Sequence, residues 1–257
     1  MSDHGRWIWY ELITPDVPGA KRFYGDLLGW TAQDLPAAPG SEPYAIVSAD
    51  GYGLGGIMNL GEAMKAEGMP PNWTGYICVD DCDAAAARAK TLGGGVMREP
   101  MDIPGIGRFA VLTDPAGAVL IVMKPTPPPG GRPEAPKGGL GLVSWHELYG
   151  AHPDEGFDFY AGMFGWTKTQ DFDMGPGVGK YQLFANQDGE VGAMMQKPAE
   201  VPAPPGTSTS AWATSARRPP APRPAAPRSC WSRWRCPAAT GCSRASTRRA
   251  RSSPPRA

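Results

Sequence analysis

An internal repeat is the sequence feature that most constrains the fold. Trp9-Tyr10-Glu11-Leu12 recurs as Trp145-His146-Glu147-Leu148, a shift of 136 residues. Two further blocks recur at shifts of 136 and 137, namely Phe23-Tyr24 with Gly29-Trp30, and Leu54 to Met58. A constant offset over three separated blocks indicates that one structural unit occurs twice.

Local patterns divide the first copy into two similar halves. A helix is predicted to open after Asp16 and to end at Gly29, and a second helix to begin at Asp81 and to end at Leu92-Gly93-Gly94. The strands expected around these helices are residues 7–13, 44–48, 54–59, 74–79, 96–101, 107–113 and 118–123. The first copy therefore consists of two βαβββ modules, and the second copy begins a third.

Apolar spacing on the first predicted helix indicates one buried face. The side chains expected on that face are Ala20, Phe23, Tyr24, Leu27 and Leu28. The equivalent Phe159-Tyr160 and Gly165-Trp166 pairs in the second copy are expected to serve packing in the same way.

Composition sets the predicted domain boundaries. A stretch rich in Pro and Gly separates the copies and is typical of a linker. We expect a complete domain at residues 1–125, a linker at 126–141, the first module of a second domain at 142–206, and a disordered tail at 207–257.

The predicted tail differs sharply from the rest of the chain. From Thr207 onward it contains no Asp, Glu, Lys, Leu, Ile, Val, Met, Phe or Tyr, so it lacks the side chains that build a core. All 25 acidic residues lie at or before Glu200, whereas 11 of the 25 basic residues are arginines from Arg217 onward. The body is therefore acidic, which argues against nucleic-acid binding by the folded part.

The tail begins where a fourth module is expected. Trp212 stands 139 residues after Trp73, which opens the second module. We favour the hypothesis that the reading frame shifts just after Trp212, because out-of-frame reading of GC-rich DNA yields Arg, Pro, Ala and Ser. The alternative is a genuine basic arm for nucleic acid or an acidic partner. If the tail is real, the incomplete second domain exposes apolar sheet and favours self-association.

Several motifs resemble the vicinal oxygen chelate superfamily, the glyoxalase, bleomycin-resistance and ring-cleaving dioxygenase group. They are Asp16 with Phe23-Tyr24 and Leu28-Gly29-Trp30, Val79-Asp80-Asp81, Leu92-Gly93-Gly94 and Asp114-Pro115-Ala116-Gly117, over residues 7–125 and 143–197. The resemblance implies an α+β fold in which paired βαβββ modules form cup-shaped mixed sheets, here as tandem domains whose last module is lost. It does not specify the reaction, since this fold supports many activities.

The resemblance also implies where a metal would bind. The family places His and Glu ligands for a divalent ion at four strand positions. The matching positions here carry Trp9, Met58, Thr74 and Ile121, with Trp145 and Met195 at the equivalent places of the second copy. None of these side chains is a good ligand for a hard cation, so we expect no metal and no other cofactor. A divalent metal is the alternative.

Strand alternation places Trp7, Trp9, Glu11 and Ile13 on one face, which in the family lines the cup. A carboxylate between tryptophans can act as a general base or hold a ligand hydroxyl or amine. Glu11, and Glu147 in the second copy, are therefore candidate catalytic residues, and the six metal-position residues are candidate ligand contacts. A purely structural role for the carboxylates is the other reading.

These observations give a first hypothesis of a metal-independent protein that binds a small, partly apolar molecule. The alternatives are an enzyme of the lyase, isomerase, hydroxylase or dioxygenase-like kind, using a metal or Glu11, and a protein interaction module. No run of about 18 apolar residues occurs, so no membrane segment is expected and the cytoplasm is the default location.

The frameshift hypothesis makes a direct prediction. Resequencing the gene around the codon for Trp212 and translating the other two frames is expected to reveal a strand–helix–strand pattern with a turn like Asp114-Pro115-Ala116-Gly117. Absence of that pattern from both frames would contradict the hypothesis.

Overall fold

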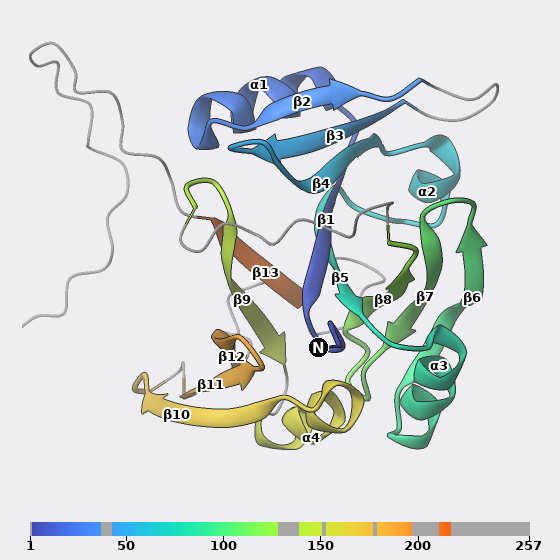
Figure 1. The fold of residues 1–257 in the computed structure, drawn as a ribbon. Helices are drawn as coiled ribbons and strands as arrows, with labels where there is room; N and C mark the ends of the chain where they lie inside the picture. Colours follow the sequence, from blue (N-terminus) through green and yellow to red (C-terminus); the bar gives the residue numbers. More distant parts are fainter. Residues whose placement is uncertain are drawn as a thin grey trace, which may run out of the picture. The chain divides into compact units, whose positions relative to one another are not determined.

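The computed structural model describes residues 2–36, 43–127, 139–150, 153–176, 179–196 and 211–216. These residues form two β-sheets (Figure 1). The elements of the first sheet and its helices are β1 Trp7–Thr14, α1 Val17–Leu28, β2 Thr31–Asp34, β3 Tyr44–Ala49, β4 Tyr52–Asn59, α2 Glu62–Ala66, β5 Asn72–Cys78, α3 Cys82–Thr91, β6 Gly95–Ile103, β7 Gly107–Thr113 and β8 Val119–Pro125. The predicted strands and helices of the first copy are all present.

The first sheet joins two modules of identical strand order. Its eight strands run β2-β3-β4-β1-β5-β8-β7-β6, so the first and last strands of each module are neighbours. These neighbours, β1 with β4 and β5 with β8, pair in parallel, whereas β1 and β5 pair antiparallel and connect the modules. This mixed sheet confirms the predicted α+β class with paired βαβββ modules.

The second sheet repeats the plan of the first module and adds one strand. Its elements are β9 Val143–Gly150, α4 Pro153–Phe164, β10 Thr167–Asp173, β11 Lys180–Asn186, β12 Gly189–Gln196 and β13 Ala211–Ala216. The strand order is β10-β11-β12-β9-β13. In β13, Ala213 lies opposite Glu147, just as Thr74 of β5 lies opposite Glu11.

Strand β13 lies inside the segment assigned to the tail. Residues 211–216 thus take the place that β5 takes in the first sheet, and the chain follows the repeat as far as Ala216. Most of the linker and the rest of residues 207–257 lie outside the described residues. The domain boundaries and the disorder of the tail therefore stay predictions.

Helix ends follow the predicted signals. The Asp16 carboxylate accepts a hydrogen bond from the Gly19 amide, and Asp81 accepts one from Ala84. Gly29 closes α1 with a left-handed φ of 71°. Strand β2 had not been identified, because its four residues are all exposed and show no apolar alternation.

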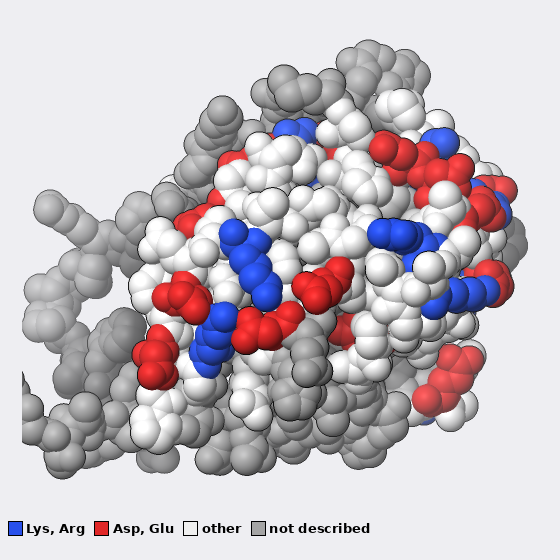
Figure 2. Space-filling view, turned by 90° about the horizontal axis from the view of Figure 1, so that it is seen from below, with Lys and Arg blue, Asp and Glu red and all other residues white. Residues whose placement is uncertain are grey.

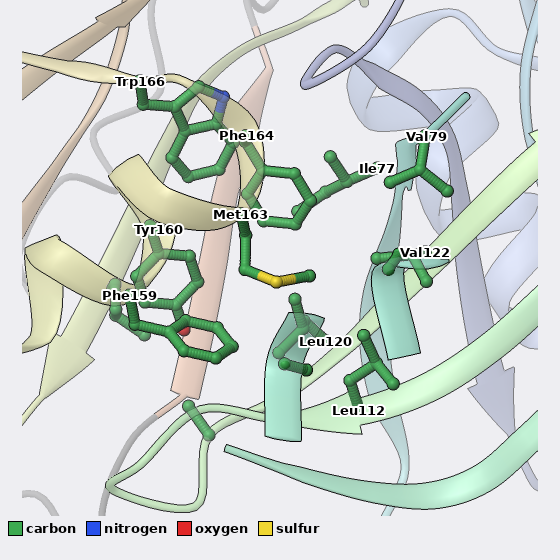
Figure 3. Close-up of a cluster of buried hydrophobic side chains, with 14 of the residues drawn as sticks. Ile77, Val79, Leu112, Leu120, Val122, Phe159, Tyr160, Met163, Phe164 and Trp166 are labelled. Atoms are coloured by element: carbon green, nitrogen blue, oxygen red, sulfur yellow. The ribbon is translucent and has the colours of Figure 1, made fainter. Parts of the chain in front are cut away.

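Each helix covers one module of its sheet. Partly buried side chains of α1 pack against a core that contains Leu12, Val47 and Ile57. The core under α3 is larger, because it continues into the second sheet. Figure 3 shows Ile77, Leu112 and Val122 of the first sheet facing aromatic side chains of α4 and the Trp166 side chain that follows it, and these belong to one buried cluster.

Phe23 corrects one packing prediction. The helical spacing placed it on the buried face of α1, yet 57% of its surface is exposed, whereas the equivalent Phe159 of α4 is 3% exposed. Phe159 is buried because α4 packs against α3: a Cβ at Gly94 would lie 2.7 Å from the Phe159 ring. Among the described residues, α1 has no such helix beside it.

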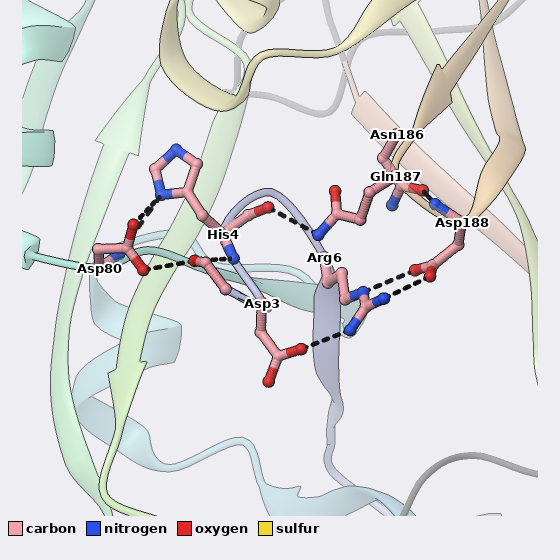
Figure 4. A network of polar contacts seen from close by, with 8 residues as sticks. Asp3, His4, Arg6, Asp80, Asn186, Gln187 and Asp188 are labelled. Atoms are coloured by element: carbon pink, nitrogen blue, oxygen red, sulfur yellow. Dashed lines mark hydrogen bonds and ion pairs between the residues drawn. The ribbon is translucent and has the colours of Figure 1, made fainter.

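The N-terminal segment ties the two copies together through polar contacts (Figure 4). The Arg6 guanidinium binds both carboxylate oxygens of Asp188, at 2.8 and 2.6 Å. The Gln187 amide donates to the His4 carbonyl at 3.0 Å. A two-point contact of this kind fixes orientation better than a single ion pair does.

Equivalent positions of the two copies also meet directly. Tyr10 and His146, 136 residues apart, share a hydrogen bond of 2.8 Å between the phenol oxygen and Nε2. His146 Nδ1 lies 2.9 Å from the Val191 carbonyl, which only accepts, so Nδ1 carries the proton and Tyr10 donates to Nε2. The imidazole also stacks on Trp7, with ring centroids 4.3 Å apart. Alternation predicted Trp7 on the same face as Trp9, but the register shifts between the two residues, and Trp7 packs on the opposite face, against the core under α3.

Within the described ranges, no helix has the length and apolar character that crossing a membrane requires.

The asymmetry between equivalent phenylalanines is testable. Phe159→Ala is expected to lower the free energy of unfolding by about 3–5 kcal/mol, because it leaves a cavity between α3 and α4. Phe23→Ala at the matched position is expected to change it by less than about 1 kcal/mol. Urea unfolding followed by circular dichroism measures both, and equal losses would contradict the different packing.

His146 predicts an acid-sensitive contact. Burial lowers its pKa from 6.5 to about 4, although the Val191 carbonyl partly opposes the shift. As the pH falls, His146 therefore takes up a proton in the unfolded chain before it does so in the folded chain. The contribution of His146 to the free energy of unfolding is fully present above about pH 6.5 and is lost as the pH falls to about 4. The loss is expected to reach about 3 kcal/mol. Urea unfolding at pH 7.5 and 4.5 should show a smaller difference for His146→Gln than for the parent chain; an unchanged difference would refute this.

Candidate functional site

An apolar layer covers the face of the first sheet that lies opposite α1 and α3. On β5 and β8, Ile77 and Val122 belong to the core under α3, and their neighbours project the other way. The layer consists of Ile8, Tyr76, Cys78, Ile121 and Met123, packed against Trp9, Phe109 and Val111. We call this side of the first sheet the cup face.

Glu11 is the buried carboxylate of the cup face and is 9% exposed. The Tyr76 hydroxyl donates to its Oε2 at 2.7 Å, and Tyr44 is also hydrogen bonded to it. The Trp9 indole donates to the Tyr44 oxygen at 3.0 Å. Three aromatic side chains from β1, β3 and β5 thus converge on one carboxylate.

The glycine opposite Glu11 makes room for this arrangement. Gly56 is the β4 partner of Glu11, and a Cβ there would collide with the Tyr44 hydroxyl. The Tyr44 side chain therefore passes over the β4 backbone at Gly56, where no Cβ blocks it, and reaches Glu11 and Trp9.

Burial and the Glu11 charge keep both phenols protonated. Burial raises the pKa of Tyr76 far above its ordinary value, and the charge and hydrogen bond of Glu11 raise it further. The pKa of Tyr44 is raised for the same reasons, opposed in part by the Trp9 indole. At neutral pH the two tyrosines are therefore hydrogen-bond donors to the carboxylate.

The sheet register gathers the predicted site residues of the first copy on this face. Glu11 lies opposite Thr74, and Trp9 lies opposite Tyr76, which in turn pairs with Ile121. Met58 pairs with Ile13, two positions beyond Glu11 on β1. Paired residues project to the same side of a sheet, so Trp9, Met58, Thr74 and Ile121 share the face with Glu11.

The second sheet carries a related arrangement around Glu147. Tyr181 donates to Glu147 at 2.6 Å, and Trp145 donates to Tyr181 at 2.9 Å. The remaining donor is Tyr149, at 2.9 Å, from the same strand as Glu147. Met195 pairs with both Tyr149 and Tyr181, so the predicted residues Trp145, Glu147 and Met195 share one face.

The carboxylate of the second sheet lies in a more open setting. Burial, followed by the hydrogen bond to Glu147, raises the pKa of Tyr181 to about 12, a smaller shift than that of Tyr44. The second phenol that donates to Glu147, Tyr149, comes from β9 itself, whereas Tyr76, which donates to Glu11, comes from the second module of the first sheet.

Sequence reasoning missed the tyrosines around both carboxylates. Tyr44 and Tyr181 are 137 residues apart, the same shift as the block at Leu54 to Met58, so the repeat contained the signal for this pair. Tyr76 and Tyr149 are not equivalent positions, so no repeat search could have connected them.

The residues at the family's metal positions do not fit a divalent ion. Trp9, Met58, Thr74 and Ile121 offer one hydroxyl and one thioether, whereas such ions take carboxylate and imidazole ligands. Among the residues that the structure describes, no group of three or more His, Cys, Asp or Glu side chains is arranged to hold a metal. The side chains at these positions therefore do not form a ligand set for a divalent ion.

Comparison with known proteins agrees with this fold. Residues 6–122 match the family model of the glyoxalase/bleomycin resistance protein/dioxygenase superfamily. CFP32 of Mycobacterium tuberculosis, named as a candidate glyoxylase, is 41% identical over 127 residues, which are 49% of this chain and 47% of CFP32. DnrV of Streptomyces peucetius, named as an anthracycline biosynthesis protein, is 35% identical over 61% of this chain and 59% of its own length.

The chain thus spans about half the length of CFP32 and somewhat more of DnrV. Among solved structures, a mutant of 4-hydroxymandelate synthase from Streptomyces coelicolor superposes with a TM-score of 0.56 at 15% identity, covering 79% of this chain and 66% of the synthase. At that identity the likeness concerns the fold alone. Residues 6–122 therefore form a domain of the glyoxalase/bleomycin resistance protein/dioxygenase superfamily.

Proposed function

We propose that the first sheet binds a small, partly apolar molecule on its cup face without a metal ion. The observation that carries the proposal is Glu11, a buried carboxylate held by Tyr76 and Tyr44 within an apolar layer. Burial of a charged group is costly unless the group is paired and hydrogen bonded. Here the hydroxyl groups of Tyr76 and Tyr44 stabilise it, and a ligand hydroxyl or amine can add a further hydrogen bond.

The surrounding side chains suit an apolar ligand body. Trp9, Phe109 and Val111 are partly exposed at the margin of the layer, so they can contact a bound molecule. Aromatic rings offer flat apolar surface and, in Trp9, a polar edge already engaged by Tyr44. This composition, apolar walls with a few placed polar groups, is typical of small-molecule sites.

The name of DnrV supplies a first ligand to test. Under this proposal, an anthracycline is expected to bind the intact chain, and the second sheet carries a more open version of the site around Glu147. The alternative is an enzyme in which Glu11 acts as general base. The enzyme alternative is favoured by the same buried carboxylate, since a general base must lie within hydrogen-bond reach of the substrate proton that it removes.

Metal content separates the proposal from metal-dependent alternatives. Elemental analysis of the purified chain is expected to find much less than one divalent ion per molecule, and ligand binding is expected to persist in EDTA. One tightly bound ion per chain, or binding abolished by EDTA, would overturn the metal-independent reading.

A substitution tests the carboxylate. Glu11→Gln is expected to weaken anthracycline binding by tenfold or more, because a hydrogen bond to a charged group contributes about 1.5–3 kcal/mol. Titration calorimetry measures the affinity, and circular dichroism verifies folding. Glu190→Gln, on an exposed position of β12, is the matched control and is expected to bind like the parent. Equal affinities for all three chains would remove Glu11 from the site.

A further inference from the structure

Arg98 lies on the cup face at the far edge of the first sheet. It belongs to β6 and pairs with Val111 of β7, a member of the apolar layer around Tyr76 and Ile121. The preceding pair is Val96 with Leu112, which face the core under α3, and the register shifts between the two pairs. This bulge turns Arg98 to the opposite side of the sheet.

The Arg98 charge reaches toward the centre of the cup face. Strands β8 and β7 separate β5 from β6, which is a path of about 14 Å across a flat sheet. The guanidinium nevertheless partly opposes the rise in the pKa of Tyr76 that burial and Glu11 cause. Sheet curvature and the long arginine side chain therefore bring its positive charge within electrostatic range of the Tyr76 hydroxyl.

Two other cations, one on β7 and one on α3, are paired with carboxylates. Arg108 binds Asp83 at 2.8 Å and Asp102 at 3.1 Å, and Lys90 binds Glu99 at 3.2 Å. Figure 2 shows one face of the molecule, on which Lys and Arg side chains lie beside Asp and Glu side chains.

Arg98 differs from these cations. The acidic residues of its own strand, Glu99 and Asp102, are engaged by Lys90 and Arg108. Within the described part of the chain, no carboxylate oxygen lies within 4.0 Å of the Arg98 guanidinium in an ion pair. An arginine is thus held at the rim of an apolar face with its hydrogen-bond donors available.

We propose that Arg98 binds an acidic group of the ligand, so that the cup face prefers an apolar, aromatic or alicyclic acid to an uncharged molecule of the same shape. A planar guanidinium presents paired donors that match a carboxylate. Glu11 lies on β1 and is held there by Tyr44 and Tyr76, and it contacts the other end of the ligand. The negative charge of Glu11 and that of the ligand's acidic group are thus kept apart. The inference rests on the proposed function and specifies its ligand class.

Two probes of equal shape test the charge preference. 2-Naphthoate and 2-naphthamide differ in one charged group, and titration calorimetry with the full chain gives both affinities. The parent chain is expected to bind the carboxylate about five- to tenfold more tightly than the amide, as for a partly exposed charged pair. Arg98→Gln is expected to abolish the preference and to leave the amide affinity unchanged.

The control removes the same charge from the opposite side of the sheet. Arg22→Gln, on an exposed position of α1, is expected to keep the full preference, so general electrostatic attraction is accounted for. Equal loss in both variants would overturn the inference, as would equal affinity of the parent for the two probes, and in both cases the proposed cup-face binding would survive. Failure of the parent to bind either probe would count against the proposed function itself, and the inference would fall with it.

Discussion

The hydrogen bond between Tyr10 and His146 joins the same position of two copies of one structural unit. Because the two residues come from β1 and β9, their contact sets the first strand of one copy beside the first strand of the other. Strand alternation then dictates the rest: the side of β1 that carries Tyr10 faces the helices and the second copy. The opposite side carries Trp9 and Glu11 and remains available for a ligand.

The equivalent helices α1 and α4 of the two copies have different surroundings. Helix α4 buries Phe159 against α3, whereas α1 leaves the equivalent Phe23 exposed. By the symmetry of the repeat, the helix that would cover Phe23 belongs to the fourth module. Strand β13 adopts the register of β5, so the first strand of that module is still in place. A loss of reading frame just after Trp212 stays a prediction, with which the exposure of Phe23 and the register of β13 are compatible.

Sequence reasoning succeeded where a local rule or the repeat decided the structure. Aspartate caps, a left-handed glycine and strand alternation located α1, α3 and the strands of the first sheet, since each depends on a few adjacent residues. Phe23 was misplaced because helical spacing defines an apolar face but not the presence of a neighbour. Tyr76 and Arg98 were missed because their roles depend on curvature and on a bulge in β6, neither of which leaves a pattern in the sequence.

The donors around Glu11 bear on whether this carboxylate can serve as a ligand of a metal ion. A cation and a phenol compete for the same carboxylate lone pairs, and here Tyr76 and Tyr44 already donate to them. The positions that would complete a metal's coordination carry an indole, a thioether, a hydroxyl and an alkyl group. A divalent ion would have to share the Glu11 lone pairs with both phenols, and the four positions offer it no second anionic ligand. The same competition favours a ligand that brings its own donor to Glu11, since a neutral hydroxyl or amine can share the carboxylate without displacing either phenol.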